Sequence, residues 1–300
     1  MRIALVANPK SGSAPAPQRL ATLLAADGAP VCVTSIQEIK ADEEGALEGQ
    51  GLAAAVAALS CDGRPDRIVV AGGDGSIGLV ALVAAEMRLA LAVVPVGTAN
   101  DFARALDLPL DVEQACALAR DPNAATRHAE LALAGERPFV NAAATGLSVV
   151  AAKEARPHKS RLGPLAYAVG AIKAAATATP LRCHVRCDGG DCFEGPAWQV
   201  VVGATGAFGG GSEIGGTSPN DGLLDVAIVP AGSRLGLARR AYGMRSGRLT
   251  KQSDVTHGRA STIEVGVEGS TSTFNVDGEV CRCDPACFSL RPGGFRVVVG

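Results

Sequence analysis

The sequence predicts two domains: an α/β domain with a parallel sheet, followed by a β-rich antiparallel sandwich. Two observations carry this prediction. In about the first hundred residues, short apolar runs alternate with stretches of helical periodicity, the pattern of a parallel sheet covered by helices on both faces. Beyond residue 125, short β-rich runs separated by turn residues are typical of an antiparallel sheet. The chain has 300 residues, 47% of them apolar, which is enough for two domains of ordinary size.

The first domain is predicted over residues 1–125. Its expected strands are residues 3–7, 31–35, 67–71 and 91–95, and its expected helices are residues 18–26, 52–59, 77–86 and a helix opening at residue 100. The strands are continuous apolar runs, whereas helix 18–26 places Leu20, Leu23 and Leu24 on one face. Ligands of such sheets bind outside the carboxyl ends of the strands. Three turns rich in glycine, proline and small polar residues fall at these ends: residues 8–13, 72–76 and 95–101.

The second domain is predicted over residues 126–290. Its expected strands are residues 131–133, 138–142, 181–187, 198–203, 224–229, 262–267, 273–276 and 288–291, with one helical stretch at 164–176. Turn residues separate these runs, which favours an antiparallel arrangement. Residues 291–300 hold a last apolar strand, 295–299, that can return to the sheet of the first domain.

Composition and charge argue against several classes of protein. The formal net charge is −2 and aromatic residues make up 3% of the chain, so neither a basic surface nor a stacking platform indicates nucleic-acid binding. The apolar run at the N-terminus stops at Asn8, which is too short for a signal peptide. No run reaches the roughly 18 apolar residues of a membrane helix, and we expect a cytoplasmic protein.

Nine cysteines are scattered along the chain, an odd number that does not suit a secreted disulfide framework. Two local groups stand out among them: Cys183, Cys187 and Cys192, and Cys281, Cys283 and Cys287. Their spacings match the paired C-x₂₋₄-C pattern of zinc sites poorly. The sequence leaves open whether these groups bind metal.

The turn Gly72-Gly73-Asp74-Gly75-Ser76 joins a predicted strand to a predicted helix. Glycines let backbone N–H groups approach phosphate oxygens, and a helix N-terminus adds partial positive charge. Asp74 would repel phosphate unless it meets Mg²⁺ or accepts a proton from an attacking hydroxyl. Taken alone, these residues fit equally well a tight turn in which Asp74 caps the helix.

The other two turns have the same character. The first is Asn8-Pro9-Lys10-Ser11-Gly12-Ser13, in which Pro9 fixes the backbone and the serines offer donors. In the third, Thr98 or Asn100 can cap a helix whose first turn holds Asp101. Neither standard nucleotide-binding fingerprint is present. Three such turns at one sheet edge nevertheless favour a phosphate site over three unrelated helix caps.

Together the turns resemble the pattern NPxSG, GGDGT and GTxNDFAR of the diacylglycerol kinase catalytic family, especially its soluble bacterial lipid kinases. This chain has NPKSG, GGDGS and GTANDFAR in the same order. The resemblance continues through Phe139-Val140-Asn141 with Thr145-Gly146, then 163–167, 218–226 and Asp277-Gly278-Glu279. It covers nearly the whole chain and implies a first domain like that of NAD kinases and phosphofructokinases, which share GGDG.

The resemblance implies an ATP site on the first domain and a general base on the second. Its nucleotide-binding residues would be Asn8, Pro9, Lys10, Ser11, Gly12, Thr34, Gly72, Gly73, Asp74, Gly75, Ser76, Thr98, Asn100 and Asp101. Glu279 is the implied base, accepting the proton of a lipid hydroxyl that attacks the γ-phosphoryl group. Mg²⁺ would neutralise the ATP oxygens, with Asp74 and Asp101 as candidates to hold it. Asp74 is also a candidate for the base, and the sequence does not separate the two assignments.

A second Mg²⁺ site is implied around residue 221. Asp221 with the backbone carbonyls of Ser218 and Leu223 would make an all-oxygen site suited to Mg²⁺. The alternative is a simple Asn-Asp-Gly hairpin turn, which the residues alone favour. The family often has an Asp near residue 130, in a carboxylate–water network, whereas this chain has Glu130.

The expected function is that of an ATP-dependent lipid kinase at the inner face of the membrane. Diacylglycerol leads as the acceptor, followed by phosphatidylglycerol and sphingoid bases, and the sequence leaves open whether the chain forms a homodimer. Basic segments at 153–161 and 234–251 are expected to aid reversible docking on anionic lipid, at roughly 1 kcal/mol per basic residue.

Two alternative functions stay open at this point. An NAD or sugar kinase shares GGDG, but GTANDFAR argues against it. A catalytically silent nucleotide-binding regulator is the other, and the intact Asp74, Asp101 and Glu279 argue against that one.

Overall fold

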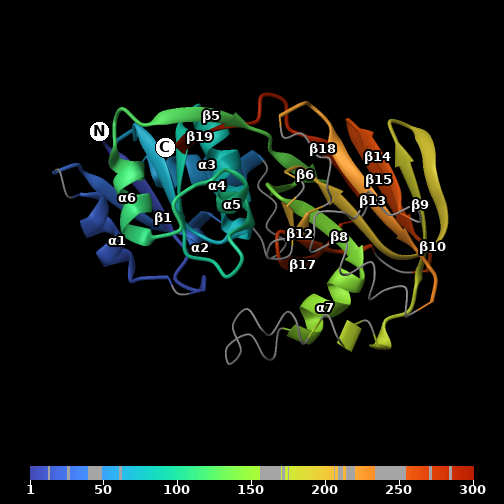
Figure 1. The fold of residues 1–300 in the computed structure, drawn as a ribbon. Helices are drawn as coiled ribbons and strands as arrows, with labels where there is room; N and C mark the ends of the chain where they lie inside the picture. The colour runs from blue at the N-terminus through green and yellow to red at the C-terminus, as the bar shows by residue number, and fades with distance from the viewer. Residues whose placement is uncertain are drawn as a thin grey trace. The chain divides into compact units, whose positions relative to one another are not determined.

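A computed structural model of the chain describes residues 1–12, 14–25, 28–39, 49–60, 63–155, 170, 173–174, 176–205, 207–208, 212–213, 220–233, 255–269, 272–283 and 286–300. The chain divides into two compact units (Figure 1). The first unit holds Met1–Leu131, Glu136–Val140 and Pro292–Gly300, and the second holds Ala132–Gly135 and Asn141–Arg291. The sequence placed the first boundary at residue 125, whereas the first unit continues to Leu131 and includes the last strand of the chain.

Within the described residues, the first unit is built on a six-stranded sheet in the order β2-β1-β3-β4-β19-β5. The strands are β1 (Ile3–Ala7), β2 (Val31–Ser35), β3 (Arg67–Gly72), β4 (Ala90–Pro95), β5 (Ala125–Ala129) and β19 (Phe295–Val299). Neighbours pair in parallel except β5, which is antiparallel to β19, so the sheet is mixed. Ala7 pairs with Ala71, and Gly72 with Pro95. β1, β3 and β4 therefore end together, and the three turns follow at one edge of the sheet.

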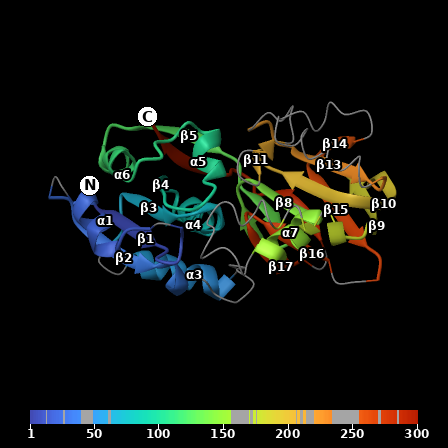
Figure 2. The same ribbon diagram turned by 60° about the horizontal axis from the view of Figure 1, so that its bottom comes forward.

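Helices cover both faces of this sheet (Figure 2). They are α1 (Pro17–Leu24), α2 (Ile36–Ile39), α3 (Gly49–Leu59), α4 (Asp74–Met87), α5 (Asp101–Ala105) and α6 (Val112–Arg120). Ile68 and Val70 of β3 belong to the apolar core beneath α2, α3 and α4, whereas Val69 between them belongs to the core beneath α1 and α6. Because side chains of a strand alternate between faces, a strand buried on both faces must be apolar throughout. The α/β prediction is confirmed.

In the second unit, the strands of the described part of the chain pair antiparallel. Their order is β17-β16-β8-β10-β9-β15-β18-β6, with β13 beside β10 and β14 beside β13. The bounds are β6 (Ala132–Ala134), β8 (Ala142–Gly146), β9 (Leu181–Cys187), β10 (Gly190–Gly203), β13 (Leu224–Pro230), β14 (Thr256–Ala260), β15 (Thr262–Val267), β16 (Thr273–Val276), β17 (Glu279–Arg282) and β18 (Cys287–Leu290). The antiparallel β-rich prediction is confirmed.

The long strand β10 organises the second unit. Its first half pairs with β9, and its second half lies between β8 and β13, so the sheet branches at this strand. The helix α7 (Leu147–Ala155) packs against β8, β16 and β17 (Figure 1). A small separate hairpin joins β11 (Ala207–Phe208) to β12 (Ser212–Glu213).

The strand predicted over residues 138–142 is wrong, because the structure has two strands there, β7 (Arg137–Phe139) and β8. Between them, the carboxylate of Asp277 accepts the backbone N–H groups of Asn141 at 3.0 Å and Ala142 at 3.1 Å. These donors are thereby unavailable to a continuous strand ladder. The predicted helix at 164–176 lies mostly outside the described residues.

Candidate functional site

The structure brings the three predicted turns into contact at the carboxyl edge of the first sheet. Gly73 and Gly97 touch through their backbones: a Cβ atom added to Gly97 would lie 2.6 Å from the Cα atom of Gly73. A Cβ atom added to Gly12, whose φ is +43°, would lie 2.5 Å from the carbonyl oxygen of Val96. Approaches this close are open only to glycine. The glycines of NPKSG, GGDGS and GTANDFAR therefore allow the three turns to pack as one cradle.

Side chains tie the first turn to the second. Asn8 donates from Nδ2 to the hydroxyl of Ser76 at 2.9 Å and accepts the backbone N–H of Lys10 at 3.1 Å through Oδ1. The backbone N–H of Asn8 also donates to the carbonyl of Ala71 at 2.9 Å. Gly72 is required here, because a Cβ atom on it would lie 2.6 Å from the Cβ atom of Ser76. Asn8 and Ser76 thus fix the shape of the cradle.

Asp74 ties the second turn to the third. It is buried, and its two carboxylate oxygens accept the backbone N–H groups of Asp101 at 3.2 Å and Phe102 at 3.0 Å. These are the first residues of α5, so Asp74 caps a neighbouring helix and not the one that it begins. Asn100 occupies the N-cap position of α5 with φ 53°, but its Oδ1 accepts the N–H of Gly97 at 2.9 Å.

The N-terminus of α4 carries no side-chain cap. Its N-cap residue is Gly73, in an extended conformation, and the helix runs for 14 residues from Asp74. The first N–H groups of a helix have no partner within the helix, and together with the helix dipole they attract anions. The cradle therefore surrounds a helix end that suits a phosphate group. Lys10 is exposed in the adjacent turn and adds a positive charge.

Among the remaining predicted nucleotide residues, Thr34 is buried on the edge strand β2, opposite Val6. Thr98 and Pro9 are exposed, and Ser11 lies against the second turn, with its hydroxyl 3.3 Å from a Cβ atom built on Gly73. The cradle consequently includes Ser11 directly. Thr98 belongs to the third turn of the cradle, and Thr34 lies near the carboxyl end of β2; the roles of both residues stay predictions.

The second unit holds Asp277-Gly278-Glu279 in the hairpin between β16 and β17. Asp277 and Gly278 have φ of 46° and 88°, as a two-residue turn of this kind requires. The Asp277 carboxylate holds the N–H groups of Asn141 and Ala142, while the Asp277 N–H donates to the carbonyl of Ala142 at 3.0 Å. Glu279 follows as the half-buried first residue of β17. Of the two carboxylates, Asp277 thus fixes the hairpin to β8.

Asn141 links this hairpin to β10. Its Oδ1 accepts the hydroxyl of Thr205 at 3.1 Å, and its carbonyl accepts the N–H of Ala204 at 2.9 Å. In the sequence Asn141 is recognisable only as part of a motif, and this structural role is not predicted from it. Partners 64 residues apart leave no periodic signal that could have revealed it.

The predicted Mg²⁺ ligands of the second unit are only partly described. Ser218 lies outside the described residues. Asp221 accepts the N–H of Leu223 at 3.2 Å through Oδ1, while Oδ2 contacts the guanidinium of Arg259. Hydrogen bonding to Asp221 raises the pKa of Arg259 above its ordinary value. The Asp221 carboxylate therefore already has a cation as its partner. The predicted all-oxygen site, which also needs the carbonyl of Ser218, stays a prediction. Sequence analysis missed Arg259.

Neither cysteine group belongs to a metal-ligand cluster made of described residues. Within the described ranges, no three His, Cys, Asp or Glu side chains converge as metal ligands would. Cys187 and Cys192 form a disulfide across the β9–β10 hairpin, with 6.0 Å between their Cα atoms. Burial raises the pKa of the Cys183 thiol to about 11, which keeps it protonated. Two of the three cysteines of this group are thus committed to a covalent bond.

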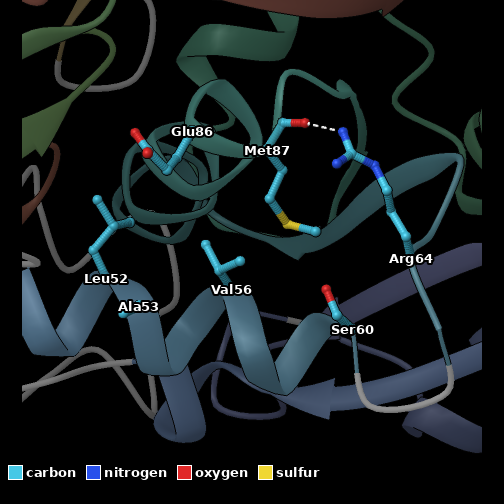
Figure 3. Close-up of a pocket in the computed structure, with 7 residues that line it drawn as sticks. All are labelled: Leu52, Ala53, Val56, Ser60, Arg64, Glu86 and Met87. Atoms are coloured by element: carbon cyan, nitrogen blue, oxygen red, sulfur yellow. Dashed lines mark hydrogen bonds between the residues drawn. The ribbon is translucent and has the colours of Figure 1, made fainter.

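A pocket of about 670 Å³ lies between α3 and α4, away from the cradle (Figure 3). Its lining residues are Leu52, Ala53, Val56, Ser60, Arg64, Glu86 and Met87. Arg64 donates to the carbonyl of Met87 at 2.6 Å, which fixes one rim. Met87 is the last residue of α4 and Asp74 the first, so the pocket and the cradle are separated by about 20 Å of helix. This pocket is not part of the candidate phosphate site.

Comparisons with known proteins agree with this architecture. The diacylglycerol kinase catalytic domain matches residues 2–133, and the YegS C-terminal NAD kinase beta sandwich-like domain matches residues 141–299. A protein of Pseudomonas fluorescens named probable lipid kinase YegS-like is 31% identical over 235 residues, covering 77% of this chain and 76% of that protein. The diacylglycerol kinase of Bacillus subtilis is 30% identical over 219 residues, covering 71% of each chain.

Solved structures share the fold at lower identity. A diacylglycerol kinase of Bacillus anthracis has a TM-score of 0.75 at 23% identity, over 100% of this chain and 97% of that one. An NAD kinase of Archaeoglobus fulgidus, solved in complex with ATP, has a TM-score of 0.50 at 12% identity, over 99% of this chain and 93% of that one. The two matched domains together span nearly the whole sequence. The first match covers most of the first unit, whereas the second covers most of the second unit and also β19, which belongs to the first unit. The chain therefore belongs to the diacylglycerol kinase catalytic family, with a YegS-type C-terminal domain, and is a lipid kinase.

Proposed function

We propose that the chain transfers the γ-phosphoryl group of ATP to a lipid hydroxyl, and that diacylglycerol is the acceptor. The observation that carries the proposal is the cradle, in which three turns pack around the uncapped N-terminus of α4. A relative that covers most of this chain is named a diacylglycerol kinase, which supports the choice of acceptor. Phosphatidylglycerol and sphingoid bases are the next acceptors to test.

The cradle supplies most of what phosphoryl transfer asks of a protein, which is positioning and electrostatic stabilisation. Backbone N–H groups at the start of α4 would bind phosphate oxygens, and Lys10 would offset their charge. Mg²⁺, when bound with ATP, would neutralise the charge that develops on the transferred group. Asp74 and Asp101 belong to the turns of the cradle and would hold the ion, directly or through water.

Glu279 is our assignment for the general base, in preference to Asp74. Both oxygens of Asp74 already hold the N-terminus of α5, so this carboxylate has a structural task. The equivalent structural task in the triplet of the second unit falls to Asp277, and Glu279 is the base that the family resemblance implies. We expect Glu279→Gln to lower kcat by roughly 10²–10⁴-fold while the protein stays folded, because the amide cannot accept the proton.

The test is a phosphorylation assay with γ-labelled ATP and purified protein. Mixed vesicles carrying diacylglycerol, phosphatidylglycerol or sphingosine are compared with NAD as a soluble acceptor, each with Mg²⁺ and with EDTA. Label should enter diacylglycerol fastest, and only with Mg²⁺. Labelled NAD without labelled lipid would overturn the proposal. Full activity of Glu279→Gln together with loss of turnover, but not of ATP binding, in Asp74→Asn would move the base to Asp74.

The kinase must also reach its lipid, and we propose reversible docking on anionic membrane. None of the helices in the described part of the chain has the length and hydrophobicity to cross a bilayer. Lys153 lies in the last turn of α7, whereas the basic residues of 234–251 fall outside the described residues. Sedimentation with vesicles should show binding that rises with anionic lipid and falls when Arg239 and Arg240 are changed to glutamate. If vesicle binding depends neither on the anionic lipid content nor on the charge at Arg239 and Arg240, this docking mode is refuted.

A further inference from the structure

Four side chains of the second unit gather on one face of the β13–β14 ribbon and the turn before it: Asp221, Asp225, His257 and Arg259. We call them the Arg259 cluster. Asp225 and Arg259 are paired residues in the antiparallel register, and His257 lies two residues before Arg259, on the same face. The side chain of Asp225 is only 2% exposed, and the other three are between 26% and 32% exposed. The cluster is thus a buried carboxylate partly covered by its own partners.

Arg259 joins the two carboxylates of the cluster. Its Nη2 contacts Oδ2 of Asp221, and its Nε lies 3.2 Å from Oδ1 of Asp225. His257 Nε2 is 2.8 Å from the same Asp225 oxygen. A guanidinium suits this task, because its planar fork presents several donors in fixed directions. A buried carboxylate without such partners would be strongly destabilising.

The same guanidinium also fixes the turn that precedes β13. Asn220 and Gly222 on either side of Asp221 have φ of 68° and 82°, in the left-handed region that asparagine and glycine enter readily. Asp221 holds this turn in two ways: Oδ1 accepts the N–H of Leu223 at 3.2 Å, and Oδ2 is held by Arg259 on β14. Arg259 therefore connects the turn, β13 and β14.

A divalent cation on Asp221 would conflict with this arrangement. Mg²⁺ requires oxygen ligands in near-octahedral geometry and keeps several of its waters. To reach Oδ2 of Asp221 it would have to displace Arg259, or lie beside it with two like charges in contact.

We propose that the Arg259 guanidinium takes the place of a divalent cation in this turn, fixing residues 220–223 to β14 and neutralising Asp221 and Asp225. Among the described residues, the turn 220–223 then needs no metal ion. The inference does not depend on which acceptor the kinase uses, and it leaves untouched the Mg²⁺ that would accompany ATP at the cradle.

Thermal unfolding and calorimetric titration, both without nucleotide and lipid, test the inference. The wild-type protein and the variants Arg259→Met, Arg259→Lys and Asp221→Asn are each compared in EDTA and in MgCl₂. Methionine keeps much of the side-chain length but removes the charge, and lysine keeps the charge but loses the fork.

We expect the wild-type Tm to be the same in EDTA and MgCl₂. Arg259→Met should lower the Tm in EDTA and recover about 2–4 °C with MgCl₂, because the exposed carboxylates can then bind the cation. Arg259→Lys should be destabilised without gaining a response to Mg²⁺. If Arg259→Met fails to fold, the comparison of wild type with Asp221→Asn decides the question.

Wild-type protein that binds Mg²⁺ and is stabilised by it, with both effects abolished in Asp221→Asn, would overturn the inference. Mg²⁺ binding that persists in Asp221→Asn places the ion elsewhere and supports it. A fall in Tm for Arg259→Met that is equally large in the Asp221→Asn background would also count against it, since the two residues would then be uncoupled.

Discussion

The two units hold their turns in place in opposite ways. This contrast lies between the cradle of the first unit and, in the second unit, the β16–β17 hairpin and the β13–β14 ribbon. In the cradle, glycines let backbone touch backbone, and the N-terminus of α4 has no side-chain cap. In the second unit, carboxylates take up the backbone and side-chain donors around them, as Asp277 does at Asn141 and Asp221 does at Leu223. The first arrangement leaves N–H groups for a ligand, whereas the second uses its donors for structure.

Because of this difference, some aspartates of the chain are better candidates for a catalytic or ligand-binding role than others. Asp277 and Asp225 have donors directed at them from their own unit, which makes them structural. Asp74 is intermediate, because it belongs to the cradle but holds α5. The role of a carboxylate in a family motif therefore depends on how many hydrogen-bond donors of its own unit are directed at it.

The largest effect should come from Gly97→Ala, which disrupts the backbone contact between Gly97 and Gly73 in the cradle. The new Cβ atom would lie 2.6 Å from the Cα atom of Gly73, so the second and third turns must separate. We expect kcat/KM for ATP to fall by at least about 100-fold, because small displacements of positioning groups are costly. The free energy of unfolding should fall by about 1–3 kcal/mol.

Gly190→Ala is the matched control in the second unit, since a Cβ atom there meets only one carbonyl oxygen at 3.5 Å. Steady-state kinetics and chemical denaturation measure both variants. Equal activity of the two variants would show that the cradle does not depend on backbone contact.

Asp277→Ala should have the next largest effect, this time mainly on stability. It leaves the N–H groups of Asn141 and Ala142 without their acceptor, at a cost of about 1–3 kcal/mol in the free energy of unfolding. Asp277→Asn keeps one carbonyl oxygen and should recover part of the loss. Urea denaturation followed by circular dichroism measures both. If Glu279→Gln destabilises the protein as much as Asp277→Ala, the division of roles within the triplet is wrong.

A smaller effect is expected from Asp74→Asn. This variant tests whether Asp74 serves structure, function or both. The amide retains one acceptor for α5 but turns its NH₂ group toward the other N–H. Loss of a helix cap costs about 1 kcal/mol, and we expect the KM for ATP to rise several-fold. Asp107→Asn, an exposed position at the other end of α5, is the control for charge alone. A loss of kcat at unchanged KM and stability would instead indicate direct participation in chemistry.

The smallest effect concerns two buried thiols, one in each unit. Burial raises the pKa of Cys116 and of Cys183 from 9.0 to about 11. At pH 8 only about one part in a thousand of each should be thiolate, so iodoacetamide should modify them only in denaturant. Mass spectrometry reads the result, with the partly exposed Cys32 as the reference.

The same shifts fix the sign of a pH effect. Between pH 9.0 and about 11 the unfolded chain loses these protons while the folded chain keeps them, so stability should fall as the pH rises through this window. Modification of Cys183 but not Cys116 at pH 8 would show that the second unit opens more readily than the first.

Much of the fold follows from local pattern. The predicted run 3–7 coincides with β1, because a strand buried on both faces is apolar throughout. The predicted run 31–35 coincides with β2, an edge strand that its β-branched residues reveal. α6 was missed although the signal was present: Asp111 precedes the helix and its carboxylate accepts the N–H groups of Glu113 and Gln114. β17 was missed because it is a four-residue edge strand whose side chains are at most half-buried, which leaves no apolar pattern.

The candidate site divides in the same way. The cradle glycines could be predicted, since each turn follows a strand that the sequence identifies. The bond from Asp74 to Phe102 spans 28 residues and exists only because two parallel turns are adjacent. The contact from Arg259 to Asp221 spans 38 residues and depends on the β13–β14 register. Neither contact produces a pattern in the local sequence. The structural roles of these residues can therefore be recognised only from the tertiary structure.

The position of β19 has a consequence for how the chain is made. This strand lies between β4 and β5, and it pairs Arg296 with Ala90. The residues that complete the first sheet thus leave the ribosome only after the entire second unit has been synthesised. Until β19 is synthesised, the backbone N–H and C=O groups on one edge of β4 have no strand partner. Contacts between residues about two hundred positions apart in the chain are also slow to form. The growing polypeptide therefore cannot finish its first unit first, and the sheet that carries the cradle becomes complete only when the whole second unit is already present.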